Sequence, residues 1–194
     1  LAAPTMTLEP RSYTPRHLVE KILASQSALR GERKLVTVLF ADVVRSMELA
    51  ERVDPEEWHR LLDRLFRILT DGVHRYEGTI NQYTGDGIMA LFGAPIAHED
   101  HAQRACAAAL DLARELGALA EDVGRESGLE FAVRIGLNSG EVVVGRIGDD
   151  LRMDYTAQGH VVGLAARVQQ LAPPGGITVT EQTARLAAGF FDFL

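Results

Sequence analysis

Apolar residues recur along the chain at spacings that are typical of strands and helices. A dense β-rich run over residues 35–40 predicts a strand that is buried on both faces. Residues 55–74 have apolar side chains at helical spacing after Asp54, which predicts a helix with an aspartate cap. Two shorter runs, 79–83 and 88–92, flank a Gly-Asp-Gly turn. They predict a hairpin with an acidic tip.

The second half of the chain continues the alternation of helices and strands. We expect an alanine-rich helix over 98–119, a strand pair (130–138 and 141–147) around Ser139-Gly140, a helix over 161–171, a strand over 177–180 and a short helix over 181–188. Hairpins interrupt the alternation, so a doubly wound parallel sheet does not fit. We therefore predict an α+β fold with a ferredoxin-like βαββαβ core.

Length and composition indicate one main domain with an extension. The chain has 194 residues, and about 150 residues per domain is usual. We expect a flexible N-terminus with a short lead helix or linker over 1–33, and one domain over 34–194. The net charge of −7 argues against a nucleic-acid partner, and no apolar run is long enough to span a membrane. A single cysteine, Cys106, favours a reducing, cytoplasmic compartment.

Two aspartates stand where the predicted sheet would bring them together. Asp42 directly follows the first strand, and Asp86 sits at the hairpin tip. In a ferredoxin-like sheet these strands are neighbours, so the carboxylates would meet and suit Mg²⁺ or Mn²⁺. The alternative is that Asp42 caps a helix and Asp86 is a turn residue. Arg134 and Arg167, taken alone, fit a phosphate contact or an ordinary surface cation.

A second polar cluster surrounds the start of the alanine-rich helix. His98 and His101, with the two acidic residues between them, resemble a metal site by composition, but no third ligand is obvious. We interpret the cluster as a polar helix start. Cys106 lies among alanines in the same helix and is expected to pack as a small apolar side chain.

Several segments together resemble the class III nucleotidyl cyclase catalytic domain. They are residues 38–44, 83–93, 134–140, 155–159 and 164–167. Their order and spacing fit the family over residues 34–190. The stretch from Glu77 to His101 is similar to a bacterial subgroup whose cyclase domain often precedes ATPase or tetratricopeptide regions. The resemblance favours the functional interpretation of both aspartates and both arginines.

The resemblance implies conversion of ATP to 3′,5′-cyclic AMP and pyrophosphate by a two-metal mechanism. It assigns two Mg²⁺ or Mn²⁺ ions to Asp42, Asp86 and the backbone carbonyl of Val43. Family sites lie between two domains in a head-to-tail pair, so a homodimer, or a heterodimer with another cyclase domain, is expected. Arg167 would come from the other subunit and stabilise the transition state. The residues expected to bind phosphate are Val44, Arg45, Ser46, Met47 and Arg134.

The sequence departs from the family pattern in the half of the site that binds base and ribose. Gln82 and Thr156 align with the base-reading lysine and aspartate, so the choice between ATP and GTP is poorly determined. Gly163 stands where the family has a ribose-orienting asparagine. Arg45 and Met47 replace small residues in the phosphate turn. The sequence stops at Leu194 before the family's final strand pair.

These departures leave three hypotheses open. The first is a weakly active adenylate cyclase dimer that favours Mn²⁺. The second is a degenerate cyclase homology domain that binds nucleotide or a partner and regulates without catalysis. The third is a cyclase that prefers another base, or a diguanylate-type enzyme. The two aspartates, Asp42 and Asp86, favour the first hypothesis, and Gly163 favours the second.

Overall fold

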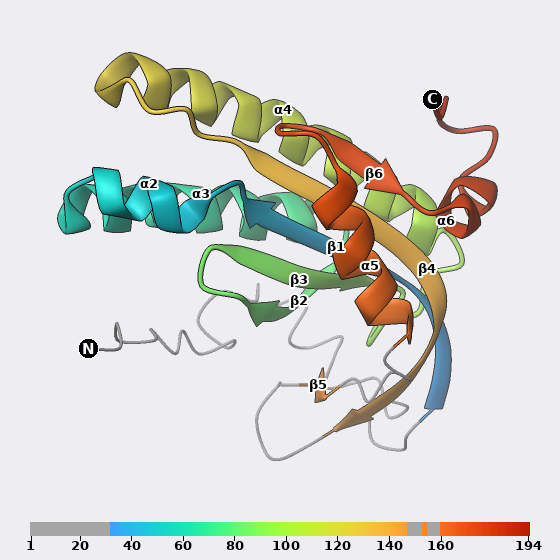
Figure 1. Ribbon diagram of the computed structural model, residues 1–194. Helices are drawn as coiled ribbons and strands as arrows, with labels where there is room; N and C mark the ends of the chain where they lie inside the picture. The colour runs from blue at the N-terminus through green and yellow to red at the C-terminus, as the bar shows by residue number, and fades with distance from the viewer. Residues whose placement is uncertain (1–31, 147–152, 155–159) are drawn as a thin grey trace.

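The computed structural model describes residues 32–146, 153–154 and 160–194 (Figure 1). The elements in chain order are β1 (Glu32–Val43), α2 (Ser46–Arg52), α3 (Pro55–Arg75), β2 (Thr79–Tyr83), β3 (Gly87–Phe92), α4 (His101–Ser127), β4 (Val133–Arg146), β5 (Met153–Asp154), α5 (His160–Leu171), β6 (Ile177–Val179) and α6 (Glu181–Leu186). Most of the flexible N-terminus and lead helix expected over 1–33, and the base-reading Thr156, lie outside the described residues. The boundary expected at residue 34 is wrong by two residues, because Glu32 and Arg33 already belong to β1.

The sheet has the strand order of the predicted ferredoxin-like core. Its strands run β2-β3-β1-β4-β5, and β6 pairs with β4. The central strand β1 is antiparallel to β3 on one side and to β4 on the other. Strand β3 therefore lies between β1 and β2, which is the split βαβ arrangement. The predicted α+β fold is confirmed.

Helices cover the sheet on two faces, and the alternation of side chains along β1 decides which residues meet them. Leu39, Ala41 and Val43 belong to a core shared with α3 and α4. Val36 and Val38 point to the opposite face, where they share a smaller core with Ala165 of α5. Figure 1 shows α5 crossing that face. Asp42 follows Val38 at an even number of positions along β1, so its side chain points to the same face, which α5 partly covers.

Most of the predicted elements are confirmed, with shifted ends. The Asp54 side chain accepts a hydrogen bond from the Glu56 N–H at 2.9 Å, so α3 has the cap that was expected. Helix α4 begins at His101 rather than at residue 98, and it runs eight residues beyond the predicted end to Ser127. It stops there because Gly128 adopts a left-handed conformation, φ 68°. No described helix has both the length and the apolar character that a membrane span requires.

The strand pair predicted around Ser139-Gly140 is wrong. Strand β4 is continuous, and it pairs with β1 from Val43↔Val133 to Glu32↔Val144. Gly140 makes no turn. A Cβ atom at Gly140 would lie 2.8 Å from a Val161 methyl group, so the glycine leaves room for α5 to approach. The dipeptide resembles a turn in sequence because close packing and tight turns both select glycine.

Candidate active site

The two predicted carboxylates meet at one end of the sheet. Asp42 lies next to the end of β1, in register with Gly87 of β3. The Val43 N–H donates to the Asp86 carbonyl at 3.2 Å, which holds the hairpin tip against β1. A Cβ atom at Gly87 would lie 2.9 Å from Asp42 Oδ1 and 2.1 Å from the Ala41 carbonyl oxygen. Gly87 is therefore needed for this approach, a role that sequence reasoning missed although the residue directly follows Asp86.

The environment of Asp42 disfavours its charge in the absence of a cation. The pKa of Asp42 is raised to about 7, first by burial and then by the hydrogen bond and charge of Asp86, while Arg134 and the Val43 N–H oppose the rise. Its Oδ1 atom is buried and has no hydrogen-bond partner among the described residues. A buried acceptor without a donor, beside a second carboxylate, suits a hard divalent cation.

The donor set at this site is small. Among residues 32–146, 153–154 and 160–194, no group of three or more histidine, cysteine, aspartate or glutamate side chains converges on a metal position. Asp42 and Asp86 fit a cation that takes its other ligands from backbone carbonyls, water and a phosphate chain. This is how Mg²⁺ is usually held in nucleotide enzymes.

The expected phosphate turn follows Asp42 directly. The Val44 N–H donates to the Ala132 carbonyl at 2.8 Å, so this group is already engaged within the main chain. Arg45 adopts a left-handed conformation, φ 54°, and its side chain forms no cap for α2. No described main-chain carbonyl accepts from the N–H groups of Arg45, Ser46 or Met47. Of the residues in the turn that were expected to bind phosphate, these three therefore have main-chain N–H groups that remain available, whereas that of Val44 does not.

Arg134 lies beside Asp42. The two residues are in-register partners on β4 and β1, so their side chains leave the same face of the sheet. The Arg134 Nη1 donates to the Gln170 carbonyl at 3.2 Å, near the end of α5. Its Nε is buried and has no described hydrogen-bond partner. Arg134 thus places positive charge at the carboxylate pair and keeps one donor unused.

Gly163 and Arg167 occupy successive turns of α5. The Arg167 side chain is exposed, and its Nε donates to the Gly163 carbonyl at 3.3 Å. Gly163 has helical neighbours on both sides, and a Cβ there would meet only Arg167 Nη2, at 3.9 Å. Gln82 lies exposed on β2, next to an irregularity in its pairing with β3. No described hydrogen bond joins Arg167 or Gln82 to the carboxylate pair.

The histidine cluster is not a metal site in this structure. His98 Nε2 lies 3.3 Å from Glu77 Oε2, whereas His101 Nδ1 lies 2.8 Å from the Thr37 hydroxyl, so the rings have different partners. His101 is the first residue of α4, which agrees with a polar helix start. Cys106 is buried, and burial raises the pKa of its thiol to about 11. It packs as the small apolar side chain that was expected.

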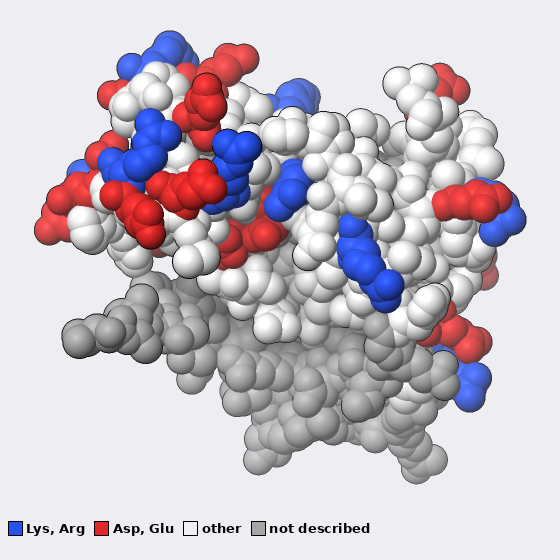
Figure 2. All heavy atoms as spheres, viewed as in Figure 1, with Lys and Arg blue, Asp and Glu red and all other residues white. Residues whose placement is uncertain are grey.

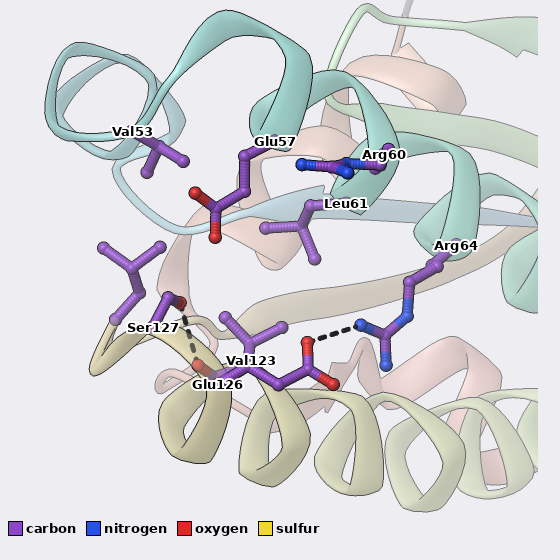
Figure 3. A pocket seen from close by; sticks show the side chains of 9 residues that line it. Val53, Glu57, Arg60, Leu61, Arg64, Val123, Glu126 and Ser127 are labelled. Carbon is purple, nitrogen blue, oxygen red and sulfur yellow. Dashed lines mark hydrogen bonds and ion pairs between the residues drawn. The ribbon is translucent and has the colours of Figure 1, made fainter.

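A cleft of about 280 Å³ lies elsewhere, between α3 and the end of α4 (Figure 3). It contains none of the predicted site residues. Arg64 at its rim pairs with Glu126 at 3.1 Å and with Asp122 at 3.5 Å. Figure 2 shows acidic and basic side chains intermixed over this end of the molecule. The lining residues are Val53, Glu57, Arg60, Leu61, Arg64, Val123, Glu126, Ser127 and Leu129.

The fold and the paired carboxylates define an α+β domain suited to metal-assisted chemistry on a phosphate chain. A family model described as "Adenylate and Guanylate cyclase catalytic domain" matches residues 30–193. The chain therefore belongs to the adenylate and guanylate cyclase catalytic domain family, as its motifs predicted.

Known relatives include cyclases of both base specificities. The chain is 35% identical over 181 residues to "Adenylate cyclase 1" of Rhizobium meliloti, covering 90% of this chain and 27% of that protein. Its fold matches the adenylyl cyclase CyaB from P. aeruginosa, with a TM-score of 0.74, 30% identity and coverage of 81% and 82% of the two chains. The guanylyl cyclase Cya2 gives a TM-score of 0.74, 33% identity and coverage of 81% and 80%.

The chain spans only part of its longer relatives. It covers 27% of the Rhizobium protein and 31% of an uncharacterised Mycobacterium tuberculosis protein to which it is 33% identical over 186 residues. The match to the solved structures, by contrast, covers most of both chains. The similarity therefore concerns the cyclase domain itself.

Proposed function

We propose that this domain converts ATP to 3′,5′-cyclic AMP and pyrophosphate, at a low rate, in the cytoplasm. The active sites would lie at the interface of a head-to-tail homodimer and hold two Mg²⁺ or Mn²⁺ ions each. The observation that carries the proposal is the buried Oδ1 of Asp42, which has no described hydrogen-bond partner and lies beside Asp86. A domain that served only as a scaffold would gain stability from replacing this pair. The adenylate cyclases among its relatives support ATP as the substrate.

Each residue of the site has a distinct task in this reaction. Asp42 and Asp86 hold the cations, with the Val43 carbonyl as a further ligand. When bound, the cations supply the positive charge that acidifies the ribose 3′-hydroxyl and neutralises the pyrophosphate leaving group. Arg134, which already lies beside Asp42, binds the triphosphate through its guanidinium. Arg167 of the partner subunit stabilises the charge that develops at the α-phosphate.

Two observations favour competing functions. Gly163 has no side chain to orient a ribose, which favours a regulatory domain that binds nucleotide without turnover. Loss of one such positioning contact costs up to about 10²-fold in rate. Gln82 presents a neutral amide where the family has a lysine. Since an amide both donates and accepts, it fits adenine or guanine, and relatives of both specificities are known.

The experiment is a cyclic nucleotide assay of the full chain. Product is measured from ATP and from GTP, with Mn²⁺ and with Mg²⁺, over a range of protein concentrations. We expect cyclic AMP, more with Mn²⁺, at a specific rate that rises with protein concentration because each site needs two subunits. Asp42→Asn and Asp86→Asn should abolish it. Asp63→Asn, which changes an exposed aspartate on α3, is the matched control and should retain it.

Each alternative gives a different result in the same assay. Cyclic GMP in excess over cyclic AMP would replace the adenylate assignment with a guanylate one. No product under any condition, together with metal-dependent ATP binding in calorimetry, would support the regulatory domain. Product that persists in Asp42→Asn would overturn the two-metal site.

A further inference from the structure

Alternate residues of β4 face α5, and each makes a contact that holds the helix. At the end of the helix, the Arg134 guanidinium donates to the Gln170 carbonyl at 3.2 Å. Two residues further along β4, Gly136 lies so close to α5 that a Cβ atom there would be 2.3 Å from the Gln169 nitrogen. Residues two apart on a strand share a face. Arg134, Gly136, Asn138 and Gly140 therefore form one row along β4 against which α5 packs, and we call this row the β4 track.

The same track continues to the first turn of α5. The Asn138 side chain is 3% exposed, and its Nδ2 donates to the Val161 carbonyl at 2.8 Å. A Cβ atom at Gly140 would lie 2.8 Å from Val161 Cγ2. The Asn138 amide therefore holds the first turn of α5 by a hydrogen bond, and the absence of a side chain at Gly140 lets the same turn pack closely on β4. Val161 lies two residues before Gly163, so this turn leads directly into the residues of the proposed site.

A hydrogen bond from Thr180 fixes the orientation of the Asn138 amide, and a chain of hydrogen bonds continues beyond Thr180. The Thr180 hydroxyl donates to Asn138 Oδ1 at 2.9 Å. A hydroxyl has one proton to donate. Thr180 must therefore accept from Thr183, at 3.1 Å, and Thr183 must accept from Ser139, at 3.0 Å. With its oxygen held by Thr180, Asn138 has its N–H groups free for the Val161 carbonyl.

This chain of hydrogen bonds begins at a residue on the other face of the sheet. Because Ser139 donates to Thr183, it must accept from the Thr37 hydroxyl, which lies at 2.8 Å. Thr37 must in turn accept from His101 Nδ1, at 2.8 Å, so the neutral ring carries its proton on Nδ1. His101 belongs to α4, whereas Val161 belongs to α5. The hydrogen bonds thus connect the helix layers on the two faces of the sheet.

We infer that Asn138 is a positioning residue, which fixes the first turn of α5 on β4 and thereby the placement of Gly163 and Arg167. This inference rests on the proposed function, because it gives the two α5 residues their roles at the ribose and the α-phosphate. Asn138 itself contacts neither the carboxylate pair nor Arg167 among the described interactions. Its effect on the reaction passes through the helix.

The experiment compares Asn138→Asp with Ser139→Ala in the full chain. An aspartate has the shape of asparagine and keeps the acceptor for Thr180, but when ionised it has no donor for the Val161 carbonyl. Ser139→Ala is the matched control. It breaks the same hydrogen-bond chain at a residue of similar burial, 4% exposed, and leaves the contact with α5 intact. The two measurements are hydrogen exchange of peptides from residues 160–171, and kcat and KM with Mn·ATP.

We expect faster exchange of α5 in Asn138→Asp and not in Ser139→Ala. We also expect kcat to fall by about 10- to 100-fold in Asn138→Asp with KM within about threefold, since a misplaced transition-state contact lowers kcat. Ser139→Ala should keep kcat within about threefold of the parent value, even if its melting temperature falls. Unchanged exchange in Asn138→Asp, or an equal loss of kcat in both variants, would overturn the inference.

A second variant covers the case in which Asn138→Asp does not fold. Gly140→Ala would place a Cβ atom 2.8 Å from Val161 Cγ2, at the next position of the track, and it replaces no member of the hydrogen-bond chain. It should speed hydrogen exchange of residues 160–171 and lower kcat in the same way. Parental exchange rates and a parental kcat would contradict the packing of α5 on β4. If the parent chain makes no cyclic nucleotide, the proposed function fails, and the exchange measurement alone decides whether Asn138 holds α5.

Discussion

Asp42 and Arg134 are in-register partners on adjacent strands, with their side chains on one face of the sheet. The arginine lowers the pKa of Asp42, but burial and the neighbouring Asp86 outweigh it, and the pKa stays raised at about 7. One guanidinium therefore does not balance two carboxyl groups. In the proposed function, a bound divalent cation would supply the positive charge that is still missing.

Mn²⁺ should stabilise the folded protein through this site. A ligand at 100 times its dissociation constant stabilises the native state by about 2.7 kcal/mol, so we expect Mn²⁺ to raise the melting temperature over that in EDTA. Asp42→Asn should abolish the rise. In EDTA the same variant should melt at or above the parent temperature, because it removes one of two adjacent carboxyl groups. Differential scanning calorimetry with and without Mn²⁺ measures both effects.

Asp63→Asn is the control for the metal experiment. Its carboxylate is exposed on α3 and pairs only with His59, at 3.7 Å, among the described ion pairs. It should show the parental response to Mn²⁺. A full response to Mn²⁺ in Asp42→Asn would place the cation elsewhere.

The proximity of the two carboxylates could be predicted from sequence, whereas the close packing of α5 on β4 could not. The first strand and the hairpin are neighbours in the predicted ferredoxin-like sheet, which brings Asp42 and Asp86 together, and the family resemblance favours this interpretation over a cap and a turn residue. Gly140 is different, because its role depends on a Val161 methyl group that is 21 positions away in the chain and reaches it only after folding. The left-handed conformation of Arg45 has no local signal either, since glycine or asparagine normally marks such a position.

Gly163→Asn should raise the rate of cyclic nucleotide formation. The position is helical and open: outside the backbone of its own helix, only Arg167 Nη2 among the described atoms is within 4 Å of where a Cβ atom would lie, so a side chain can start there without displacing the backbone. Helix propensity also favours the change slightly, because asparagine is a few tenths of a kcal/mol better than glycine. We expect an increase of about tenfold or more in kcat, measured as cyclic AMP formed at saturating Mn·ATP.

Gly163→Ala separates the amide from the helix propensity. Alanine improves the helix more than asparagine does, but it has no group that binds a ribose hydroxyl. Its rate should stay near the parental value. Equal rates in the alanine and asparagine variants would show that the missing amide does not limit this domain.

His101 should make the protein less stable in mild acid. Burial lowers the pKa of His101, helped by the charge of His98 and opposed by that of Asp100. Below the ordinary histidine pKa of about 6.5, the unfolded chain takes up a proton that the folded chain binds less tightly. The free energy of unfolding therefore falls as the pH drops through that value. Urea denaturation between pH 5 and 8 measures the slope.

The contribution of His101 to this slope is the difference between the pH dependence of the free energy of unfolding in the parent and in His101→Asn. Asp42 titrates in an overlapping range with the opposite sign, since its raised pKa makes the folded chain the better proton acceptor between about pH 4 and 7. Both proteins contain Asp42, so its effect cancels in the comparison. His101→Asn should lose less stability on acidification than the parent. His59→Asn, which changes an exposed histidine on α3, should follow the parent curve.

Two glycine-to-alanine substitutions should have opposite effects on stability. At Gly136 the new Cβ would lie 2.3 Å from the Gln169 nitrogen, an atom of the helix backbone that moves only if α5 moves. We expect Gly136→Ala to lower the free energy of unfolding by about 1–3 kcal/mol or more. Gly117 lies in the middle of α4, and outside the backbone of its own helix no described atom lies within 4 Å of the place that a Cβ would take there. Gly117→Ala should raise stability by about 0.5–1 kcal/mol. Urea denaturation of both variants tests this contrast, and destabilisation of similar size at both positions would contradict the close approach of α5 to β4.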